Sequence, residues 1–436
     1  MANKIVSFHE DSSAMRYIPV VLPELVKGLL GEKPLQDATE RNAFARFSEL
    51  LQALYHTHYF ERYRDLNRYY QPFNPDQDTT TLESWSEKDR VCYQQQLFTD
   101  LKLLLTKANY DELDETLINE SLSQELSSNL SVDVEMDDFE QILFFVRGHG
   151  IQKNKKRNWK HLYLTSTIEE VATYQRLCVV FRFQTEEKLR ESLKKRGMNR
   201  FSIWRHILHH RAVMETTASR DYIFLRLFRD VPKSDLEMLF PNSKVHFTFL
   251  DKIKLGVTGG AGTAGGLWAL ISKLAIAVKP LTILMAILGF GSIVGRQVSN
   301  VMHHQNSYQM VLSRSLYTHS LDINVGVIGS LIDQAREEEI KEALLAYYFL
   351  MRAGNKGMSI GSLDQKVEQH LMMRYGFFMD FEVQDAVVKL KLSGLVNEDA
   401  SGLLHAVSLE EASKKLTSQW EDIFSVAKRL SLLGKI

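Results

Sequence analysis

Cysteine is almost absent from this chain of 436 residues, and charge of neither sign prevails. The two cysteines, Cys92 and Cys178, cannot build a disulfide framework and lack the spacing of metal ligands. They predict a reducing compartment and ordinary thiols. With 53 basic and 54 acidic residues, the net charge of −1 excludes a global attraction to nucleic acid or to acidic membranes. Any such attraction must come from local patches.

Sequence signatures of catalysis and of export are missing as well. The chain has no Ser/His/Asp or Cys/His nucleophile pattern, no CxxC pair, no P-loop lysine and no HExxH. Its N-terminus has neither an apolar run long enough for a signal peptide nor the Arg-rich, acid-poor composition of a transit peptide. We therefore predict no catalytic residues, no cofactor, no metal and no cleavable targeting segment.

Acidic residues are absent between Lys252 and Leu321, although they are common elsewhere. Inside this window, residues 255–272 and 280–295 carry no charge at all. As helices they would measure roughly 27 and 24 Å, close to the ~30 Å hydrocarbon core of a bilayer. The pattern predicts a transmembrane helical hairpin over residues 253–297.

Glycines four residues apart recur within this predicted hairpin. Small residues at that spacing let helix backbones approach closely in lipid. We assign transmembrane helix packing to Gly256, Gly260, Gly262, Gly266, Gly291 and Gly295. Such packing allows a homo-oligomer and, as an alternative function, a transport or channel role. No charge lies within the two spans, which disfavours an ion relay.

Two alternatives compete for the same stretch. Gly260–Gly265 matches G-x-G-x-x-G, the outline of a dinucleotide-binding turn, which would make the chain a nucleotide-dependent enzyme. The acid that such a site places about 20 residues onward is missing before Asp322. The helix that would follow, over 267–278, lacks a polar outer face. A buried core hairpin is the other alternative.

A two-span hairpin places both flanks on one side of the bilayer. Since no export signal precedes it, both soluble parts are assigned to the cytoplasmic side. Contacts with anionic lipid headgroups are predicted for the basic residues Lys155, Lys156, Arg157, Lys252, Lys254 and Arg296. A second basic run, from Lys188 to Arg200, has the same interpretation or is a solvated helix face.

The sequence predicts an α+β membrane protein in five parts. They are a helical N-terminal region (1–128), an α+β domain (129–252), the transmembrane hairpin (253–297), a connecting helix (298–330) and a winged-helix-like domain (331–436). Helical spacing of apolar residues predicts helices over 22–30, 39–70, 82–105, 110–126 and 185–213. Alternation predicts strands over 131–134, 141–148, 159–165, 175–184, 222–230 and 244–250.

The C-terminal part has the element order of a winged helix. Helices are expected over 335–352, 362–375 and 381–392, strands over 394–397 and 403–407, and a last helix over 409–420. Residues 330–436 hold 13 Lys and Arg against 16 Asp and Glu, a sign opposite to that needed for phosphate binding. We therefore predict contact with an unknown protein partner and no nucleic acid.

Two short motifs could carry chemistry. Asp76, Asp78 and Thr80 match D-x-D-x-T, the nucleophile loop of phosphoryl-transferring hydrolases, but the prolines before them exclude a central strand. A capped turn is favoured. His206 and His210 lie one helical turn apart, as in zinc sites, yet the neighbouring arginines oppose a cation.

Several stretches carry a resemblance to a known family, in the same order along nearly the whole chain. They are residues 16–20, 56–79, 225–245, 326–350 and 378–396, and FRDVPKSDLEMLFP at 228–241 is the most specific. They resemble the domain-of-unknown-function family that includes transmembrane protein 143. The resemblance implies a membrane protein, mitochondrial in animals, with no established activity and no catalytic residues to carry over. Without a transit peptide, we expect the bacterial cytoplasmic membrane instead.

Taken together, these patterns predict a non-enzymatic scaffold or regulator anchored in a lipid bilayer by two spans. Its winged-helix-like domain would contact a protein partner.

Overall fold

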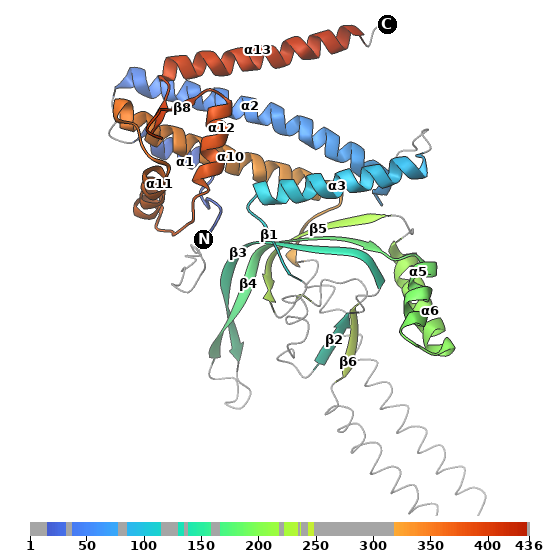
Figure 1. Ribbon diagram of the computed structural model, residues 1–436. Coiled ribbons are helices and arrows are strands. Elements are labelled where there is room, and N and C mark those ends of the chain that lie inside the picture. Colours follow the sequence, from blue (N-terminus) through green and yellow to red (C-terminus); the bar gives the residue numbers. More distant parts are fainter. Residues whose placement is uncertain are drawn as a thin grey trace, which may run out of the picture.

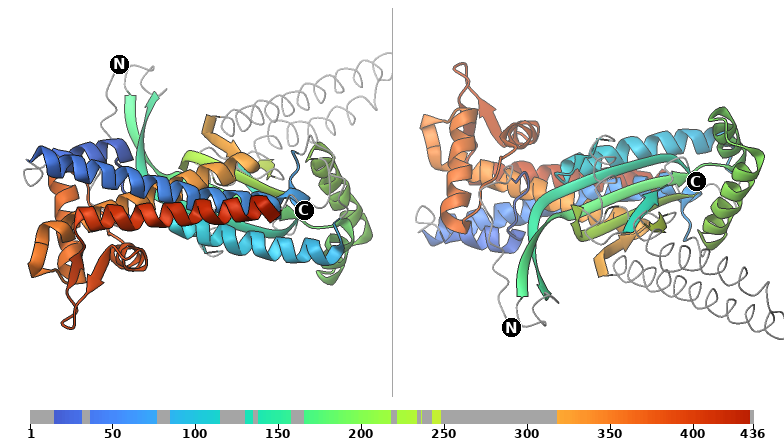
Figure 2. Two further views of the ribbon diagram at one scale, coloured as in Figure 1. Left: turned by 90° about the horizontal axis from the view of Figure 1, so that it is seen from above. Right: turned by 90° about the horizontal axis from the view of Figure 1, so that it is seen from below.

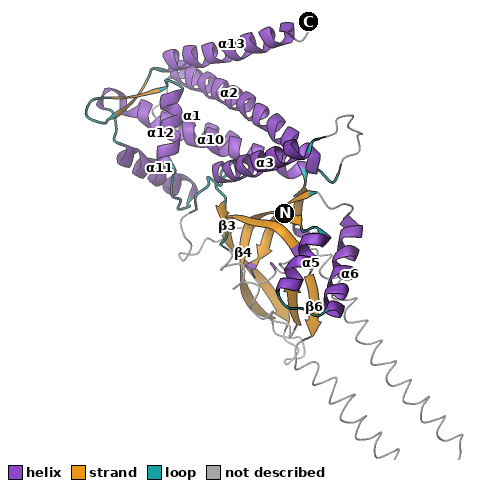
Figure 3. Cartoon of the chain, turned by 45° about the vertical axis from the view of Figure 1, so that its right-hand side comes forward, coloured by secondary structure: helices purple, strands orange, loops and turns teal. Residues whose placement is uncertain are grey.

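The computed structural model describes residues 15–31, 37–76, 85–114, 130–134, 138–157, 166–217, 222–233, 236, 243–247 and 318–433. Side chains are described throughout these ranges except at 130–134, 153–157, 166–169, 209, 212–217, 243–247 and 424–433. The chain is α+β: a layer of long helices lies over one face of an antiparallel sheet (Figure 1). Figure 3 shows this division, with helices above the strands and one helical pair at the side.

The helices are α1 (Leu22–Leu30), α2 (Ala38–Tyr70), α3 (Glu87–Lys107), α5 (Glu186–Lys195), α6 (Arg200–Thr217), α10 (Val325–Ala353), α11 (Ile360–Tyr375), α12 (Val383–Leu392) and α13 (Leu409–Leu433). Short 3-10 helices are η2 (Gln71–Phe73) and η7 (Gly354–Lys356). The strands are β1 (Asp111–Glu112), β2 (Leu130–Val134), β3 (Phe139–Arg157), β4 (Ser166–Phe183), β5 (Ile223–Pro232), β6 (Ser243–Phe247), β7 (Ser320–Ile323), β8 (Val396–Glu398) and β9 (Leu404–Ala406).

The structure corrects the prediction of a membrane-spanning protein. Among the described residues, no helix is long and apolar enough to cross a membrane. The longest ones, α2 and α10, carry charged residues along their length, which a bilayer core would penalise. The two-span α+β membrane fold and the multi-pass bacterial membrane placement are therefore wrong by this finding. The hairpin residues 253–297 themselves lie outside the described residues.

The main sheet has the strand order β1-β3-β4-β5-β7, and every neighbouring pair is antiparallel. Alternate residues of its strands enter two separate cores, because successive side chains in a strand point to opposite faces. Cys178, Val180 and Leu225 pack beneath α2, α3 and α10. The opposite face is rich in phenylalanine, including Phe181 and Phe224, whose rings stack 5.1 Å apart. Because both faces of the sheet are buried, its strands are almost continuously apolar in sequence.

Helix α10 passes through two hydrophobic cores in turn. Its first half, from Val327 to Ala335, packs on the sheet together with α3 and the end of α2. Its second half, from Ile340 to Leu350, is the centre of the core formed with α1, the start of α2, α11, α12 and α13. Viewed from above, α13 lies along α2, and α3 continues the helical layer beside them (Figure 2). The helix therefore joins the sheet to the C-terminal part.

The C-terminal part has its helices and strands in the order expected from the sequence, α10-α11-α12-β8-β9-α13. The strands β8 and β9 pair as an antiparallel wing. Before α11, Met358 forms an antiparallel bridge with Leu404 of β9. A third short segment thus lies beside the two wing strands, and we call residues 354–408 with the second half of α10 the winged module.

Several predicted elements differ from the structure. The helix expected over 110–126 is wrong at its start, since Asp111 and Glu112 form β1, and residues 115–129 are not described. The helix expected over 185–213 is two helices, because Gly197 adopts a left-handed φ of 76° between α5 and α6. Strand β7 was not predicted. Its four residues pair only with β5, about ninety positions earlier, so no local pattern announces it.

Candidate functional site

Four charged side chains lie buried in the middle of α10, between its two hydrophobic cores. They are Glu338, Glu339, Lys341 and Glu342, each at most 4% exposed. Burying a charge is costly unless it is paired and hydrogen-bonded, so the partners of this group decide its role. We call these four residues and their charged partners Lys107, Arg147 and Lys389 the charged joint.

The first part of the charged joint holds the N-terminal segment. Ile18 N–H donates to Glu338 Oε2 at 2.8 Å, and Lys341 Nζ donates to Ile18 O at 3.0 Å. Lys341 also lies 3.0 Å from Glu338 Oε1. The buried ion pair Glu338–Lys341 therefore binds both the backbone N–H and the backbone C=O of Ile18. Without it, burial would leave these two backbone groups without hydrogen bonds.

The same carboxylate reaches the sheet. Arg147 of β3 donates from Nη2 to Glu338 Oε1 at 3.0 Å and from Nη1 to Gln334 Oε1 at 2.7 Å. The guanidinium stacks over the ring of Tyr17, 4.3 Å from its centroid. Arginine suits this position because its planar fork binds two acceptors while its face packs on an aromatic ring. Glu338 thus ties the N-terminal segment and the sheet to α10.

The second part of the charged joint holds α12. Lys389 Nζ lies 2.9 Å from Glu339 and 3.6 Å from Glu342, and it also pairs with Asp385 one turn earlier. Lys107 of α3 pairs with Glu339 as well. Lys389 therefore fastens the winged module to α10, and Lys107 links α3 to the same glutamate.

Burial and charge set the protonation of this second part. Burial would raise the pKa of Glu339, but the charges of Lys389 and Lys107 outweigh it and leave the pKa below its ordinary value. Glu342 is shielded more deeply, and burial raises its pKa to about 8 despite Lys389. Burial lowers the pKa of Lys389, but the attraction of Glu342 and Glu339 is greater, so the pKa lies above its ordinary value. Lys389 is therefore a permanent cation that faces one ionised glutamate and one protonated glutamate at neutral pH.

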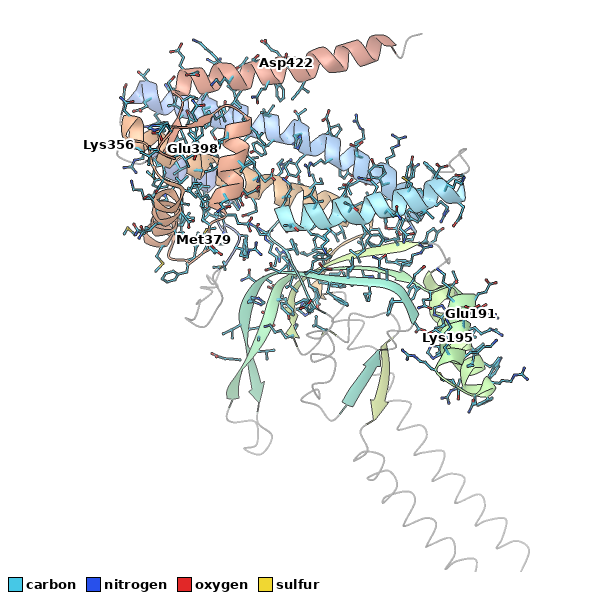
Figure 4. All side chains as sticks on the ribbon, in the orientation of Figure 1. Glu191, Lys195, Lys356, Met379, Glu398 and Asp422 are labelled. Atoms are coloured by element: carbon cyan, nitrogen blue, oxygen red, sulfur yellow. The ribbon has the colours of Figure 1, made fainter. Side chains whose placement is uncertain are left out.

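The pairing of Lys389 determines what α12 shows to solvent. Its other lysine, Lys391, pairs with Glu398 of the wing, one of the side chains labelled in Figure 4. The outward face instead carries Val388, 53% exposed, and Leu392, 83% exposed. The helix that would read a nucleic acid in a winged helix thus presents apolar side chains, and its cations are engaged with carboxylates.

Chemistry at the charged joint is limited by its burial. No group of three or more His, Cys, Asp or Glu side chains in the described ranges could hold a metal ion. The buried thiol of Cys178 has its pKa raised to about 12 by desolvation, so it is not a nucleophile near neutral pH. The charged joint positions α10 relative to its neighbours, and the carboxylates of Glu338 and Glu339 are paired with lysines of the protein.

The histidine pair, whose zinc-like spacing the sequence analysis weighed and disfavoured, meets an aspartate. His206 Nε2 lies 2.9 Å from Oδ1 of the buried Asp138, and His210 Nδ1 lies 3.5 Å from the same oxygen. The other ring nitrogen of His210 donates to Gln184 O at 3.1 Å. These contacts fix the inner face of α6 to the ends of β3 and β4, so we assign the histidines to anchoring.

Asp76, the described residue of the D-x-D-x-T motif, does not have the structural setting of a nucleophile loop. Such a loop follows a buried strand, whereas Asp76 follows the 3-10 helix η2. Its carboxylate accepts a hydrogen bond of 2.6 Å from Asn324, which has a left-handed φ of 49° at the start of α10. Asn324 in turn accepts from Tyr70 and is paired with Leu225 of β5. Asp76 therefore supports a strained corner, and residues 77–80 lie outside the described ranges.

The remaining predicted site residues cannot be placed. The packing glycines Gly256, Gly260, Gly262, Gly266, Gly291 and Gly295, and the basic residues Lys252, Lys254 and Arg296, lie outside the described residues. Lys155, Lys156 and Arg157 belong to the far end of β3, but their side chains are not described.

The sequence analysis did not single out the charged joint. The pattern that could have revealed it is the charged run EEEIKE at 337–342, which is followed by the apolar LLAYYFL. Consecutive residues of a helix point in different directions, so some of these charged side chains must face the protein interior. Its partners Arg147 and Lys389 come from distant elements, so spacing along the chain gives no indication of them.

Comparison with known proteins identifies one family. A family described as protein of unknown function (DUF3754) matches residues 174–326, from within β4 through α5, α6, β5, β6 and β7 to the first turn of α10. A domain of this family is therefore present in the chain. No solved structure matches the chain.

Proposed function

We propose that this protein is a non-enzymatic scaffold or regulator that contacts a protein partner through the exposed face of α12 in the winged module. One observation carries the proposal: both lysines of α12 are engaged with carboxylates, and Val388 and Leu392 are left exposed. An exposed apolar pair on a short rigid helix fits a protein surface better than a phosphate backbone.

The charge of the surrounding surface supports a protein partner. The C-terminal part has an excess of acidic residues, and Asp385, Glu398 and Asp399 lie exposed or partly exposed on α12 and in the wing. Asp399 accepts hydrogen bonds from Ser401, Leu403 and His405, so its carboxylate shapes the wing turn, and these bonds hold its pKa below the ordinary range. Nucleic acid would meet negative charge from both the helix and the wing.

The test is a double substitution, Val388→Glu with Leu392→Glu. Because both side chains are exposed, the variant should fold normally, and its thermal unfolding midpoint should stay within a few degrees of the unaltered protein. Cross-linking followed by mass spectrometry identifies the partners that the unaltered protein contacts through residues of α12. We expect the double variant to no longer cross-link to these partners. The matched control is Leu103→Glu, which changes an exposed leucine of α3 and should retain them.

A second measurement separates protein contact from nucleic-acid binding. Fluorescence anisotropy with a labelled DNA duplex at low salt should show no saturable binding. Binding that falls steeply with salt and is lost in Lys391→Ala would contradict the proposal.

We also propose kinship with the family that includes transmembrane protein 143. It rests on the stretches quoted above, two of which meet in the structure, since Ile18 is clamped by Glu338 and Lys341. No activity follows from this kinship. The proposed function therefore rests on the exposed face of α12 alone.

A further inference from the structure

Helix α6 of the α5–α6 pair exposes three large apolar side chains on its outer face. Phe201 is 68% exposed, Trp204 58% and Leu208 52%. With 3.6 residues per turn, these three positions follow one another along a single stripe of α6. Large apolar side chains gathered on one exposed stripe usually mark an interaction site.

The inner face explains why the stripe is held outward. Ile203 and Ile207 pack with Leu189 and Leu193 of α5 in a small separate core. Asp138 binds His206 on the same inner side. Because the inner face is fixed by both apolar packing and a buried polar contact, α6 cannot turn its outer stripe inward without losing them.

Positive charge borders the stripe. Residues 186–211 contain eight Lys and Arg and three Glu. Lys188 is paired with Glu140, and Arg211 with Glu186. Arg200 and Arg205 are exposed and stand on opposite sides of the stripe by helical spacing. Figure 4 shows α5 with the labelled Glu191 and Lys195 at the side of the sheet, away from the winged module.

We propose that the outer face of α6 binds an acidic amphipathic helix of a partner protein, with Trp204 as the apolar anchor and Arg200 and Arg205 pairing with carboxylates. Charge complementarity selects an acidic occupant and excludes a second copy of the same basic face. Trp and Arg are the residue types that dominate binding energy at protein interfaces, and the arginine fork matches a carboxylate in two hydrogen bonds. The rings of Phe201 and Trp204 already lie 5.9 Å apart, so the anchor is formed before binding.

This surface is separate from the one on α12, so the protein offers two different faces to partners. The α12 face is apolar with acidic neighbours, whereas the α6 face is apolar with basic neighbours. The two substitutions Val388→Glu and Leu392→Glu should therefore leave binding at α6 unchanged.

The experiment uses the full chain and a synthetic peptide with leucine at helical spacing, glutamate elsewhere and no basic residue. Fluorescence anisotropy of the labelled peptide should show saturable binding that weakens as salt increases. Trp204→Ala should weaken it about tenfold or more, and Arg205→Glu should weaken it and reduce its dependence on salt. Phe60→Ala, an exposed aromatic of α2, is the matched control and should leave binding unchanged.

Three results would overturn the proposal. One is the absence of saturable peptide binding. Another is equal binding of a peptide in which lysine replaces every glutamate. The third is Trp204-dependent capture by vesicles of phosphatidylcholine and phosphatidylserine without any binding of the acidic peptide, which would assign the face to anionic lipid. Circular dichroism of each variant verifies that the substitutions leave the fold intact.

Discussion

Helices α6 and α12 carry cations at similar density along the chain, yet they differ in where those cations lie. On α12, Lys389 turns inward to Glu339, and Lys391 is paired with the wing. On α6, Arg200 and Arg205 remain exposed beside an apolar stripe. The difference comes from the elements beneath: α12 packs on a segment of α10 rich in carboxylates, whereas α6 packs on apolar residues of α5 and on one aspartate already bound to histidine. The charge of a surface thus depends on the neighbours that fold against it.

Deleting one cation from each helix tests this difference most strongly. Lys389→Met should lower the free energy of unfolding by about 3 kcal/mol, because the buried, ionised Glu339 then keeps only Lys107 as a cationic partner. Arg205→Met should change it by no more than about 0.5 kcal/mol, since the side chain is exposed. Urea denaturation of both variants measures the two values. Equal effects would show that Lys389 contributes no more to stability than a surface residue.

The anchor of α6 provides the next largest effect. Asp138→Ala should cost about 2 kcal/mol, because the ring nitrogen of His206 then loses its buried acceptor. The loss should be local: amide hydrogen exchange should speed up in α5 and α6, while α12 keeps its protection. Asp89→Ala, which removes an exposed capping carboxylate of α3, is a control for losing an acid elsewhere. Faster exchange over the whole chain would contradict a local anchor.

Sequence patterns predicted the elements whose periodicity is local. The helix expected over 39–70 is observed as α2 at 38–70, and the one expected over 381–392 as α12 at 383–392. The short edge strand β7 was missed because its pairing with β5 depends on a distant segment.

The candidate site could be predicted less well than the fold. The two lysines of α12 were visible in the sequence, but their carboxylate partners come from α10 and the wing, so spacing could not reveal that they are engaged. The histidines of α6 have the spacing of a zinc site, which the sequence analysis disfavoured, but nothing in that spacing indicated the aspartate they bind, about seventy residues earlier. Long-range pairing of charge is thus the information that periodicity lacks.

The smallest expected effect concerns protonation at the charged joint. Burial raises the pKa of Glu342 from its ordinary value of 4.5 to about 8, so the folded state keeps a proton that the unfolded state releases. Between these two pH values the folded protein binds more protons, and its stability falls as pH rises. The pKa of Glu339 is lowered, so its contribution to stability is already complete above pH 4.5. Glu339 therefore does not alter the pH dependence that Glu342 causes.

Glu342→Gln imitates the protonated carboxyl and removes the dependence. Going from about pH 7 to about pH 9, the unaltered protein should lose about 1 kcal/mol of stability relative to this variant. Urea denaturation at both pH values measures the difference, and Glu410→Gln, at an exposed position of α13, should leave the dependence unchanged. If the two curves run parallel, Glu342 is already ionised near neutral pH. Lys389 would then face two charged glutamates, and its contrast with Arg205 on α6 would be larger than the structure indicates.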